Sequence, residues 1–218
     1  MTTKNIWFHT HSGIAFDLLD PKPEMIVFSD VFWSLAHQAR YNGHAAQFIS
    51  IAEHSVRVAV IAEALFGKAH RRCGLGHDFP ESITGDVPSP VIKMLNSTID
   101  TSHDTWSTGL GAWAKFVFPI ERAFAERMAL PELVDLPKEV KRADCLALML
   151  EKEACLAASP RPPGDGWPII DEAEIAEAQK AWRAYCRTWF GALYAEFGWT
   201  PSVARATLTS EAFKEGWF

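Results

Sequence analysis

Cysteine is scarce in this 218-residue sequence, and its four copies are dispersed. Cys73, Cys145, Cys155 and Cys186 form no C-x-x-C pair. This spacing argues against a structural zinc ribbon and is typical of a reducing compartment. The N-terminus has no basic segment followed by an apolar one, and no apolar run approaches the ~18 residues that span a bilayer. We therefore expect a cytoplasmic protein without membrane partners.

An excess of positive charge is also lacking. The chain has 21 Lys and Arg against 27 Asp and Glu, which gives a formal net charge of −6 and a pI near 5.7. A protein that binds a nucleic-acid polymer needs a basic face, so this class of partner is disfavoured. An anionic small substrate would have to be attracted by local cations rather than by the field of the whole protein.

Aromatic residues, in contrast, are abundant, with nine Trp and 14 Phe. Exposed aromatic patches often become interfaces, so we predict a homo-oligomer, a dimer or a higher assembly. The length fits a single domain over residues 1–218 with a sizeable core. A hydrophobic fraction of 48% and a charged fraction of 22% are ordinary for a globular protein.

The first 28 residues favour a small β-hairpin. Two β-prone runs, 6–11 and 14–18, flank Ser12-Gly13, and Pro21 and Pro23 then break the chain. His9 and His11 alternate onto one face of the first strand. Because no third metal ligand is near them in the sequence, we interpret them as structural or substrate-lining side chains rather than as ligands.

The remainder of the chain is predicted to be helical. Ser29 is a candidate N-cap for a helix that stops at Asn42-Gly43, and Ser50 with Glu53 forms a capping box for a helix that ends near Phe66, before Gly67. Further helices are expected at 68–79, from Pro88 onward, within 101–128 with breaks at Gly109, Gly111 and Pro119, from Pro137 onward, at 171–197 and within 201–218. We predict an all-α bundle with a hairpin edge (1–28), a helical core (29–158), a surface loop (159–170) and C-terminal helices (171–218).

Four possible metal ligands fall on different predicted helices. His77 and Asp78 lie together in a short segment, residues 76–88, that also contains Glu81 and Asp86. His54 shares its helix face with apolar residues and should point inward. Asp144 lies inside an apolar run, where a buried carboxylate needs a metal or an Arg. Imidazole and carboxylate together suit a first-row divalent ion, so His54, His77, Asp78 and Asp144 are predicted to bind one metal.

The order of these residues resembles the HD-domain phosphohydrolase superfamily. The match consists of residues 52–55, the pattern H-D-x-x-E-x-x-x-G-D-x-P-x-P over 77–90, and residues 140–144, and it covers roughly residues 29–155. Within the superfamily the sequence is similar to the YfbR-like branch, which includes deoxynucleoside 5′-monophosphate phosphatases and phage dATP triphosphohydrolases. The segments around Ser12-Gly13 and Arg40-Tyr41-Asn42-Gly43-His44 are closer to the phage type.

This resemblance implies an HD-type helical bundle and assigns further roles. The four ligands would hold one divalent metal (Co²⁺, Mn²⁺, Zn²⁺ or Mg²⁺), and Glu81 and Asp86 would position or activate the attacking water. Arg40 matches a phosphate-binding residue, and Tyr41 replaces the Trp of the monophosphatase. His44 and Lys93 are additional candidates for phosphate contacts.

Structural alternatives remain open for several of these residues at this point. Glu81 can instead cap the next helix, and Asp86 can be a turn residue. Arg40 can pair with Asp86 or Glu81, and Lys93 can lie on a solvated helix face.

The expected activity is metal-dependent hydrolysis of deoxynucleotides in the cytoplasm. We favour a deoxynucleoside triphosphohydrolase that releases deoxynucleoside and tripolyphosphate, with dATP as the first substrate to test. The alternative within the same class is a 5′-nucleotidase that acts on deoxynucleoside monophosphates. An alternative of a different class is a non-catalytic helical module that binds a nucleotide or a partner protein.

Overall fold

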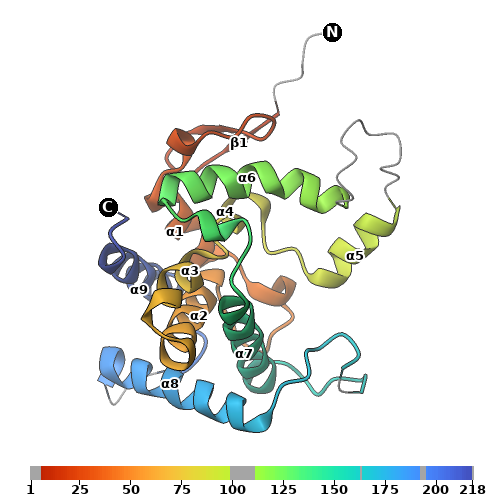
Figure 1. The fold of residues 1–218 in the computed structure, drawn as a ribbon, viewed down its shortest axis with the longest axis vertical. Helices are drawn as coiled ribbons and strands as arrows, with labels where there is room; N and C mark the ends of the chain where they lie inside the picture. The colour runs from red at the N-terminus through yellow and green to blue at the C-terminus, as the bar shows by residue number, and fades with distance from the viewer. Residues whose placement is uncertain (1–5, 99–110, 163, 192–194, 218) are drawn as a thin grey trace.

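A computed structural model describes residues 6–98, 111–162, 164–191 and 195–217. Within these residues the chain is mainly helical, with a single two-stranded antiparallel sheet at one end (Figure 1). This confirms the predicted all-α class with an N-terminal hairpin.

The hairpin pairs β1 (Trp7–His9) with β2 (Ala15–Asp17), and Phe8 lies opposite Phe16. Its turn contains Gly13, whose φ of 93° favours glycine. Asp30 holds the turn on the first helix by accepting hydrogen bonds from Thr10 Oγ1, Ser12 Oγ and the Ser12 backbone N–H. The predicted hairpin and the Ser12-Gly13 turn are therefore both present.

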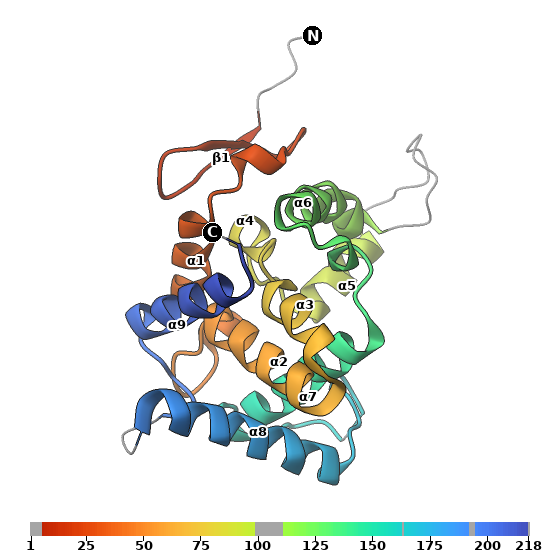
Figure 2. The ribbon, with the colours of Figure 1, turned by 60° about the vertical axis from the view of Figure 1, so that its left-hand side comes forward.

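The helices surround a central one, α2, whose residues 51–62 are all buried. The helices α1, α3, α7, α8 and α9 all pack on α2 (Figure 2). In chain order the elements are η1 (Pro23–Met25), α1 (Phe28–His37), η2 (Arg40–Gly43), α2 (Ile51–Phe66), η3 (Lys68–His70), α3 (Arg71–Gly76), α4 (Glu81–Thr84), α5 (Ser89–Thr98), α6 (Ala112–Met128), η4 (Pro131–Leu133), α7 (Lys138–Cys155), α8 (Glu172–Phe190) and α9 (Pro201–Lys214).

Local capping signals fix the ends of α2 as predicted. The Ser50 hydroxyl accepts a hydrogen bond from the Glu53 backbone N–H, and the helix ends before Gly67, which has a φ of 104°. The helix packs a large aromatic cluster on one side and a smaller aliphatic cluster, shared with α7 and α8, on the other. Because each fully buried aliphatic or aromatic side chain contributes roughly 1.5–3 kcal/mol, α2 is the most strongly anchored place for a functional residue.

The helix predicted from Ser29 to Asn42-Gly43 is shorter than expected. It begins at Phe28 and ends at His37, after which Gln38 and Ala39 are extended. Ala39 pairs with Ser50 in an isolated β-bridge, and the Arg40 N–H donates to Ile49 O at 2.9 Å. These backbone bonds to a distant segment end the helix, and the residues around Arg40 are thereby held against the start of α2.

Other predicted boundaries also change. The helix expected at 68–79 becomes η3 and α3, and α3 ends at Gly76. Pro119 lies inside α6 without ending it, whereas Gly109 is outside the described residues. The helix expected at 171–197 ends at Phe190, before Gly191.

The predicted surface loop and the predicted start of the helix after Pro137 both agree with the structure. The described part of 159–170 has no helix or strand, and α7 begins after Pro137.

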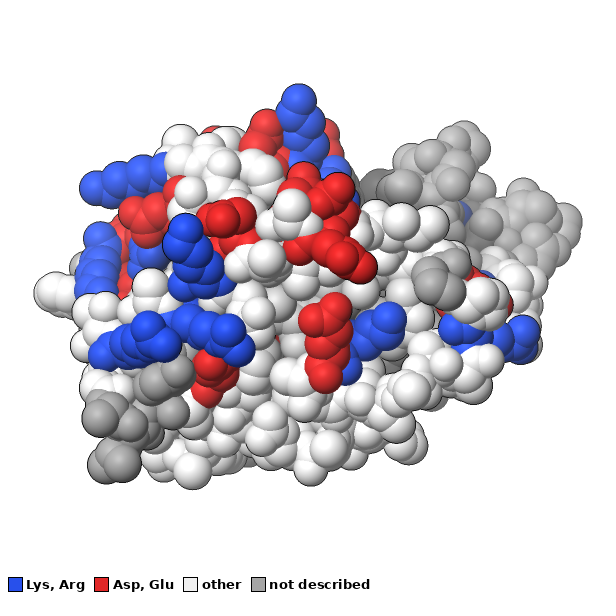
Figure 3. Space-filling view, turned by 90° about the horizontal axis from the view of Figure 1, so that it is seen from below, with Lys and Arg blue, Asp and Glu red and all other residues white. Residues whose placement is uncertain are grey.

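On the lower face in Figure 1, where α8 lies, acidic and basic side chains are interspersed (Figure 3), so this face offers no continuous basic surface. Among the helices in the described ranges, none combines the length and the apolar character that a membrane span requires.

Candidate metal centre

Three separated parts of the chain bring the four predicted ligands together. His54 comes from the first half of α2, His77 and Asp78 follow the end of α3, and Asp144 lies on α7. Ligand atoms of His54, His77 and Asp144 all lie within 4.8 Å of one another. The Oδ2 atom of Asp78 lies 3.5 Å from Nε2 of His54 and 3.2 Å from Nε2 of His77.

The hydrogen bonds of the two imidazoles fit a bound cation. Nδ1 of His54 contacts Glu151 Oε1 at 2.8 Å, and Nδ1 of His77 contacts Gly74 O at 2.8 Å. Each Nδ1 therefore donates a proton, which leaves Nε2 as the ligand atom. Both Nε2 atoms are buried and have no hydrogen-bond partner among the described residues. The lone pair of each Nε2 faces carboxylate oxygens. The two repel each other unless a proton or a metal ion lies between them.

Asp144 differs from its expected environment. Its side chain is 42% exposed, although the apolar run around it predicted a buried carboxylate. Its Oδ1 still lies 3.1 Å from Nε2 of His54 and 4.0 Å from Nε2 of His77. The prediction of burial is therefore wrong, and the partly exposed Asp144 marks the side on which the candidate centre meets solvent.

The carboxylate that is fully buried on α7 is Glu151, which the sequence analysis missed. It accepts hydrogen bonds from Arg40 Nε at 2.9 Å, the Tyr41 hydroxyl at 2.8 Å, His54 Nδ1 and Arg57 Nη1. Burial alone would raise the pKa of Glu151, but Arg40, His54 and Arg57 outweigh this effect and hold it well below its usual range. Because Glu151 follows Asp144 by seven residues, two helical turns, this spacing was the available signal.

A network of buried charged side chains connects His54 to the rest of the core. The guanidinium of Arg57 bridges Glu151 and Glu53 and lies 4.7 Å from the Trp182 ring and 4.3 Å from the Phe197 ring. Glu53 also accepts hydrogen bonds from the backbone N–H groups of residues 198 and 199. The segment between α8 and α9 thus supports His54 indirectly, through Glu53, Arg57 and Glu151.

Arg40 lies beside the candidate metal centre, and its phosphate-binding role stays a prediction. It is buried, and its Nη1 lies 3.9 Å from Asp78 Oδ2 and 3.8 Å from Asp86 Oδ2. The alternative pairing with Asp86 is therefore present as a long contact, while the closer partner of Arg40 is Glu151.

The turn that carries Arg40 is strained. Tyr41, Asn42 and Gly43 have successive φ values of 56°, 50° and 77°. A non-glycine residue in this region costs about 1–3 kcal/mol and persists only where surrounding contacts fix it. The Tyr41 hydroxyl is fixed by Glu151, so its predicted contact with substrate would have to come from the ring face.

Glu81 and Asp86 both lie near the centre, and their carboxyl groups differ in their partners. Burial, followed by the neighbouring Asp78 and Asp86 charges, raises the pKa of Glu81 well above its usual range. Burial also raises the pKa of Asp86, although Arg40 opposes this. The Oε2 atom of Glu81 is buried and has no hydrogen-bond partner within the described part of the chain. Glu81 opens α4 without capping it through a side-chain bond.

The remaining predicted phosphate contacts are not brought to the centre. His44 is exposed at the end of η2, and Lys93 is exposed on α5. In the described ranges, neither side chain has a hydrogen bond or ion pair with the candidate ligands or with Arg40; His44 bonds only through its backbone N–H, which donates to Tyr41 O at 2.9 Å. His9 and His11 line a separate cavity, so their interpretation as lining residues stays compatible with their positions.

The environment of His54 makes metal binding dependent on pH. Burial and the charge of Arg40 lower the pKa of His54, but contacts with Glu151 and Asp144 outweigh them and raise it to about 9. Below that pH a metal must displace a proton from Nε2. We expect the affinity for Co²⁺ to rise about tenfold per pH unit between about pH 6.5 and 8.5. Titration calorimetry in buffers of different ionisation enthalpy measures the proton release, and a pH-independent affinity would contradict the expectation.

Two curated proteins are similar to this chain, whereas no protein-family model matches it. An uncharacterized protein of Rhodobacter capsulatus is 31% identical over 161 residues, which cover 69% of this chain and 73% of that protein. The uncharacterized protein YfdR of Escherichia coli is 25% identical over 168 residues, which cover 77% of this chain and 80% of YfdR. The chain therefore belongs to the same family as the Rhodobacter protein.

Proposed function

We propose that this protein is a metal-dependent phosphohydrolase of the HD-domain type that acts on deoxynucleotides. One observation carries the proposal: two buried imidazoles present unpartnered Nε2 atoms to the carboxylates of Asp78 and Asp144. The adjacent Arg40 adds a buried cation of the type that binds phosphate. The resemblance of residues 77–90 to the superfamily motif supports the same reaction class.

In this proposal each residue has a separate task. His54, His77, Asp78 and Asp144 would hold a divalent ion, which supplies Lewis acidity and neutralises phosphate charge. Arg40 orients a phosphate oxygen with its guanidinium, which Glu151 holds in place. Glu81 accepts the proton of the attacking water, and its unpartnered Oε2 favours it over Asp86, which lies close to Arg40.

The preferred substrate in the proposal is a deoxynucleoside triphosphate, with dATP first. The phage-like segments around Ser12-Gly13 and residues 40–44 support this choice. The alternative is dephosphorylation of deoxynucleoside monophosphates. A cytoplasmic location agrees with both alternatives because free deoxynucleotides are found there, and the four cysteines are unpaired. A homo-oligomer remains our prediction for the assembly.

A panel of deoxynucleoside tri- and monophosphates with Co²⁺, Mn²⁺, Mg²⁺ and Zn²⁺ tests the activity. Tripolyphosphate released from dATP supports the triphosphohydrolase, and orthophosphate released from a monophosphate supports the 5′-nucleotidase. Turnover of neither substrate would overturn the enzymatic proposal and favour a non-catalytic binding module.

Metal content provides an independent test of the ligand set. We expect Asp78→Ala and His54→Ala to lose the metal and the activity together, because each removes one of the four proposed ligands. Asp165→Ala, a change in the exposed loop, is the matched control and should retain both. Inductively coupled plasma mass spectrometry of purified protein gives the stoichiometry. Full metal content in Asp78→Ala and His54→Ala would show that the site is assigned incorrectly.

A further inference from the structure

An open groove lies at the start of α1, whereas Arg40 follows the end of that helix. Residues of η1, α1, α3, the end of α6 and the segment 216–217 line the groove, and its volume is about 920 Å³. This volume is near the upper end of the range for small-molecule sites. Neither Arg40 nor any of the four candidate metal ligands lies among the described residues that line it, so the groove is separate from the candidate metal centre.

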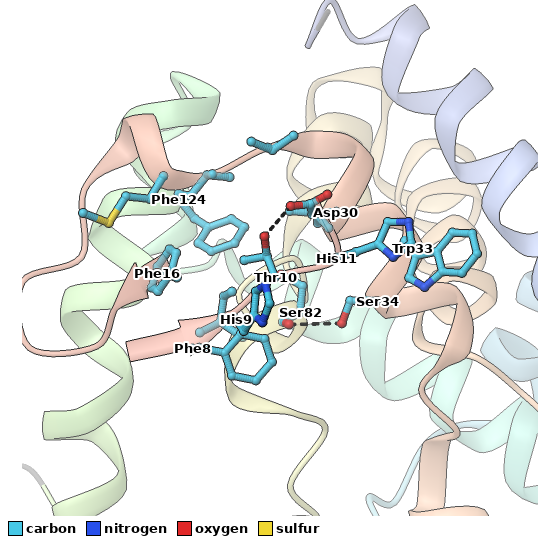
Figure 4. Close-up of a pocket in the computed structure, with 15 residues that line it drawn as sticks. Phe8, His9, Thr10, His11, Phe16, Asp30, Trp33, Ser34, Ser82 and Phe124 are labelled. Carbon is cyan, nitrogen blue, oxygen red and sulfur yellow. Dashed lines mark hydrogen bonds between the residues drawn. The ribbon is translucent and has the colours of Figure 1, made fainter. Parts of the chain in front are cut away.

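The walls of the groove can be reached from solvent. Glu24 and Arg127 are exposed, and Arg72 is partly exposed. The cavity beneath the hairpin differs in this respect (Figure 4), because the Phe16 and Phe124 side chains on its walls are fully buried. A ligand can therefore contact the charged side chains of the groove without displacing core residues.

Two arginines of the groove, Arg72 and Arg127, have no carboxylate partner within the described residues. Arg72 instead donates from Nη2 to Met128 O at 2.7 Å. Arg127 donates from Nε to Ile26 O at 3.2 Å. Several other arginines do pair with a carboxylate, namely Arg40, Arg57, Arg71, Arg142, Arg161 and Arg183. The groove therefore offers two cations to an anion that the described part of the chain does not supply.

An aromatic ring holds each of these guanidinium groups in place. Arg127 lies 4.5 Å from the Phe28 ring, and Arg72 lies 5.3 Å from the Trp217 ring. The two rings stack on each other with their centroids 6.3 Å apart. A guanidinium that a ring and a carbonyl already fix loses little further freedom when an anion binds, and this favours binding.

Both guanidinium groups retain donors for a ligand. A guanidinium has five N–H donors in a planar fork, and within the described residues Arg127 uses only the one on Nε. Nη1 of Arg72 likewise has no partner there, and it is not among the enclosed polar atoms, whereas Nε of the same side chain is. The Nη atoms of Arg127 and Nη1 of Arg72 are therefore accessible to the oxygens of an anion.

The charges of the groove favour an anion. Glu24 is the one acidic side chain among the described residues that line it, so two guanidinium groups against one carboxylate give a formal charge of +1. The protein as a whole carries −6, so an anion is attracted by such a local excess and not by the overall field. Pro23, Val27 and Ala129 add accessible apolar surface to the lining, which suits a hydrocarbon chain.

We propose that this groove binds a small linear dianion, a hydrocarbon chain with a carboxylate at each end. One carboxylate accepts hydrogen bonds from Arg127 and the other from Arg72, because the two guanidinium groups lie on different rings. The site does not depend on the proposed phosphohydrolase activity. Since Arg72 belongs to α3, which ends directly before His77, the ligand would contact the helix that leads to the candidate metal centre.

A series of paired ligands tests the proposal. Titration calorimetry on the full chain at pH ~7.5, where every carboxylate is ionised, would compare succinate, adipate and suberate with butyrate, hexanoate and octanoate, the monocarboxylates of the same chain lengths. We expect the best dicarboxylate to bind at least about threefold more tightly than its monocarboxylate, because it forms one additional ion pair. Equal affinity for the two members of that pair, or no saturable binding of any dicarboxylate, would overturn the proposal. Inorganic phosphate that binds as tightly as the best dicarboxylate would also overturn it, since one compact anion would then suffice.

Variants of exposed residues locate the binding site. Arg127→Gln should weaken binding of the best dicarboxylate at least about threefold. Arg122→Gln, exposed on the same helix, is the matched control and should leave the affinity unchanged. Glu24→Gln should tighten binding, because it removes the carboxylate that repels the ligand. All three side chains are exposed, so the variants should be as stable as the wild type. Unchanged affinity in Arg127→Gln would exclude this groove as the site.

Asp78→Ala separates the groove from the candidate metal centre. This variant should lose the metal and still bind the best dicarboxylate like the wild type, because Asp78 does not line the groove. Thermal melting checks that the variant is folded. Loss of dicarboxylate binding in the folded variant would place the ligand on the metal and overturn the proposal. A protein that is inactive in the nucleotide panel should still bind the dicarboxylate, so the failures of the two proposals are distinguishable.

Discussion

Replacement of Glu151 by alanine is expected to lower the free energy of unfolding by about 3–5 kcal/mol, because removal of one partner leaves buried charge uncompensated. Arg40, Arg57 and the Tyr41 hydroxyl all lose a bond to a carboxylate that is fully buried. Glu153→Ala, two residues further along α7 and exposed, is the matched control and should change stability little. Urea denaturation followed by circular dichroism measures the difference.

A milder change at the same position separates support of the fold from support of the metal. Glu151→Gln retains the shape and one acceptor oxygen but removes the charge that orients His54 through Nδ1. We expect metal affinity to fall about 10- to 100-fold, as for other partners that orient a ligating histidine. A metal affinity equal to that of Glu153→Gln would mean that Glu151 supports the fold but not the metal site.

Glu81→Gln is expected to reduce turnover about 10²- to 10⁴-fold, the usual contribution of a positioned general base. Metal content should remain stoichiometric, since Glu81 is not among the proposed ligands. The comparison of turnover with metal content therefore distinguishes this variant from Asp78→Ala, which should lose both. Steady-state hydrolysis of the best substrate from the nucleotide panel is the measurement.

The same variant should not lose stability. Burial raises the folded-state pKa of Glu81 above its unfolded value, so its ionisation destabilises the fold increasingly as the pH rises above about 4.5. Glutamine resembles the neutral carboxyl and removes this cost, so Glu81→Gln should melt at or above the wild-type temperature near pH ~7. Glu177→Gln, exposed on α8, should match the wild type in both turnover and melting temperature. Activity at the wild-type level in Glu81→Gln would exclude Glu81 as the proton acceptor.

Elements that depend on local signals could be predicted from the sequence. Ser50 and Gly67 set the two ends of α2, and Ser12-Gly13 marks the hairpin turn. The end of α1 at His37 could not be predicted, because the break depends on the bridge between Ala39 and Ser50, which are joined only in the tertiary structure. Pro119 was expected to end a helix, but α6 continues through it.

The candidate site likewise combines residues that the sequence indicates with residues whose role appears only in the tertiary structure. The histidines and aspartates are residue types that suggest chemistry on their own, and their joint occurrence pointed to one centre. Glu151 was missed because a glutamate near the end of a helix is typically solvated, and only the folded chain shows four donors around it. The exposure of Asp144 likewise depends on which neighbours cover α7, and periodicity does not determine that.

The position of Arg57 between two aromatic rings has a consequence for how the molecule can be divided. One of those rings, Phe197, follows α8. The backbone N–H groups of residues 198 and 199 donate hydrogen bonds to the Glu53 carboxylate. The last quarter of the polypeptide therefore holds α2, the helix that carries His54, in place. A fragment cut off after residue 158 would retain every proposed ligand and still lack a rigid platform for them.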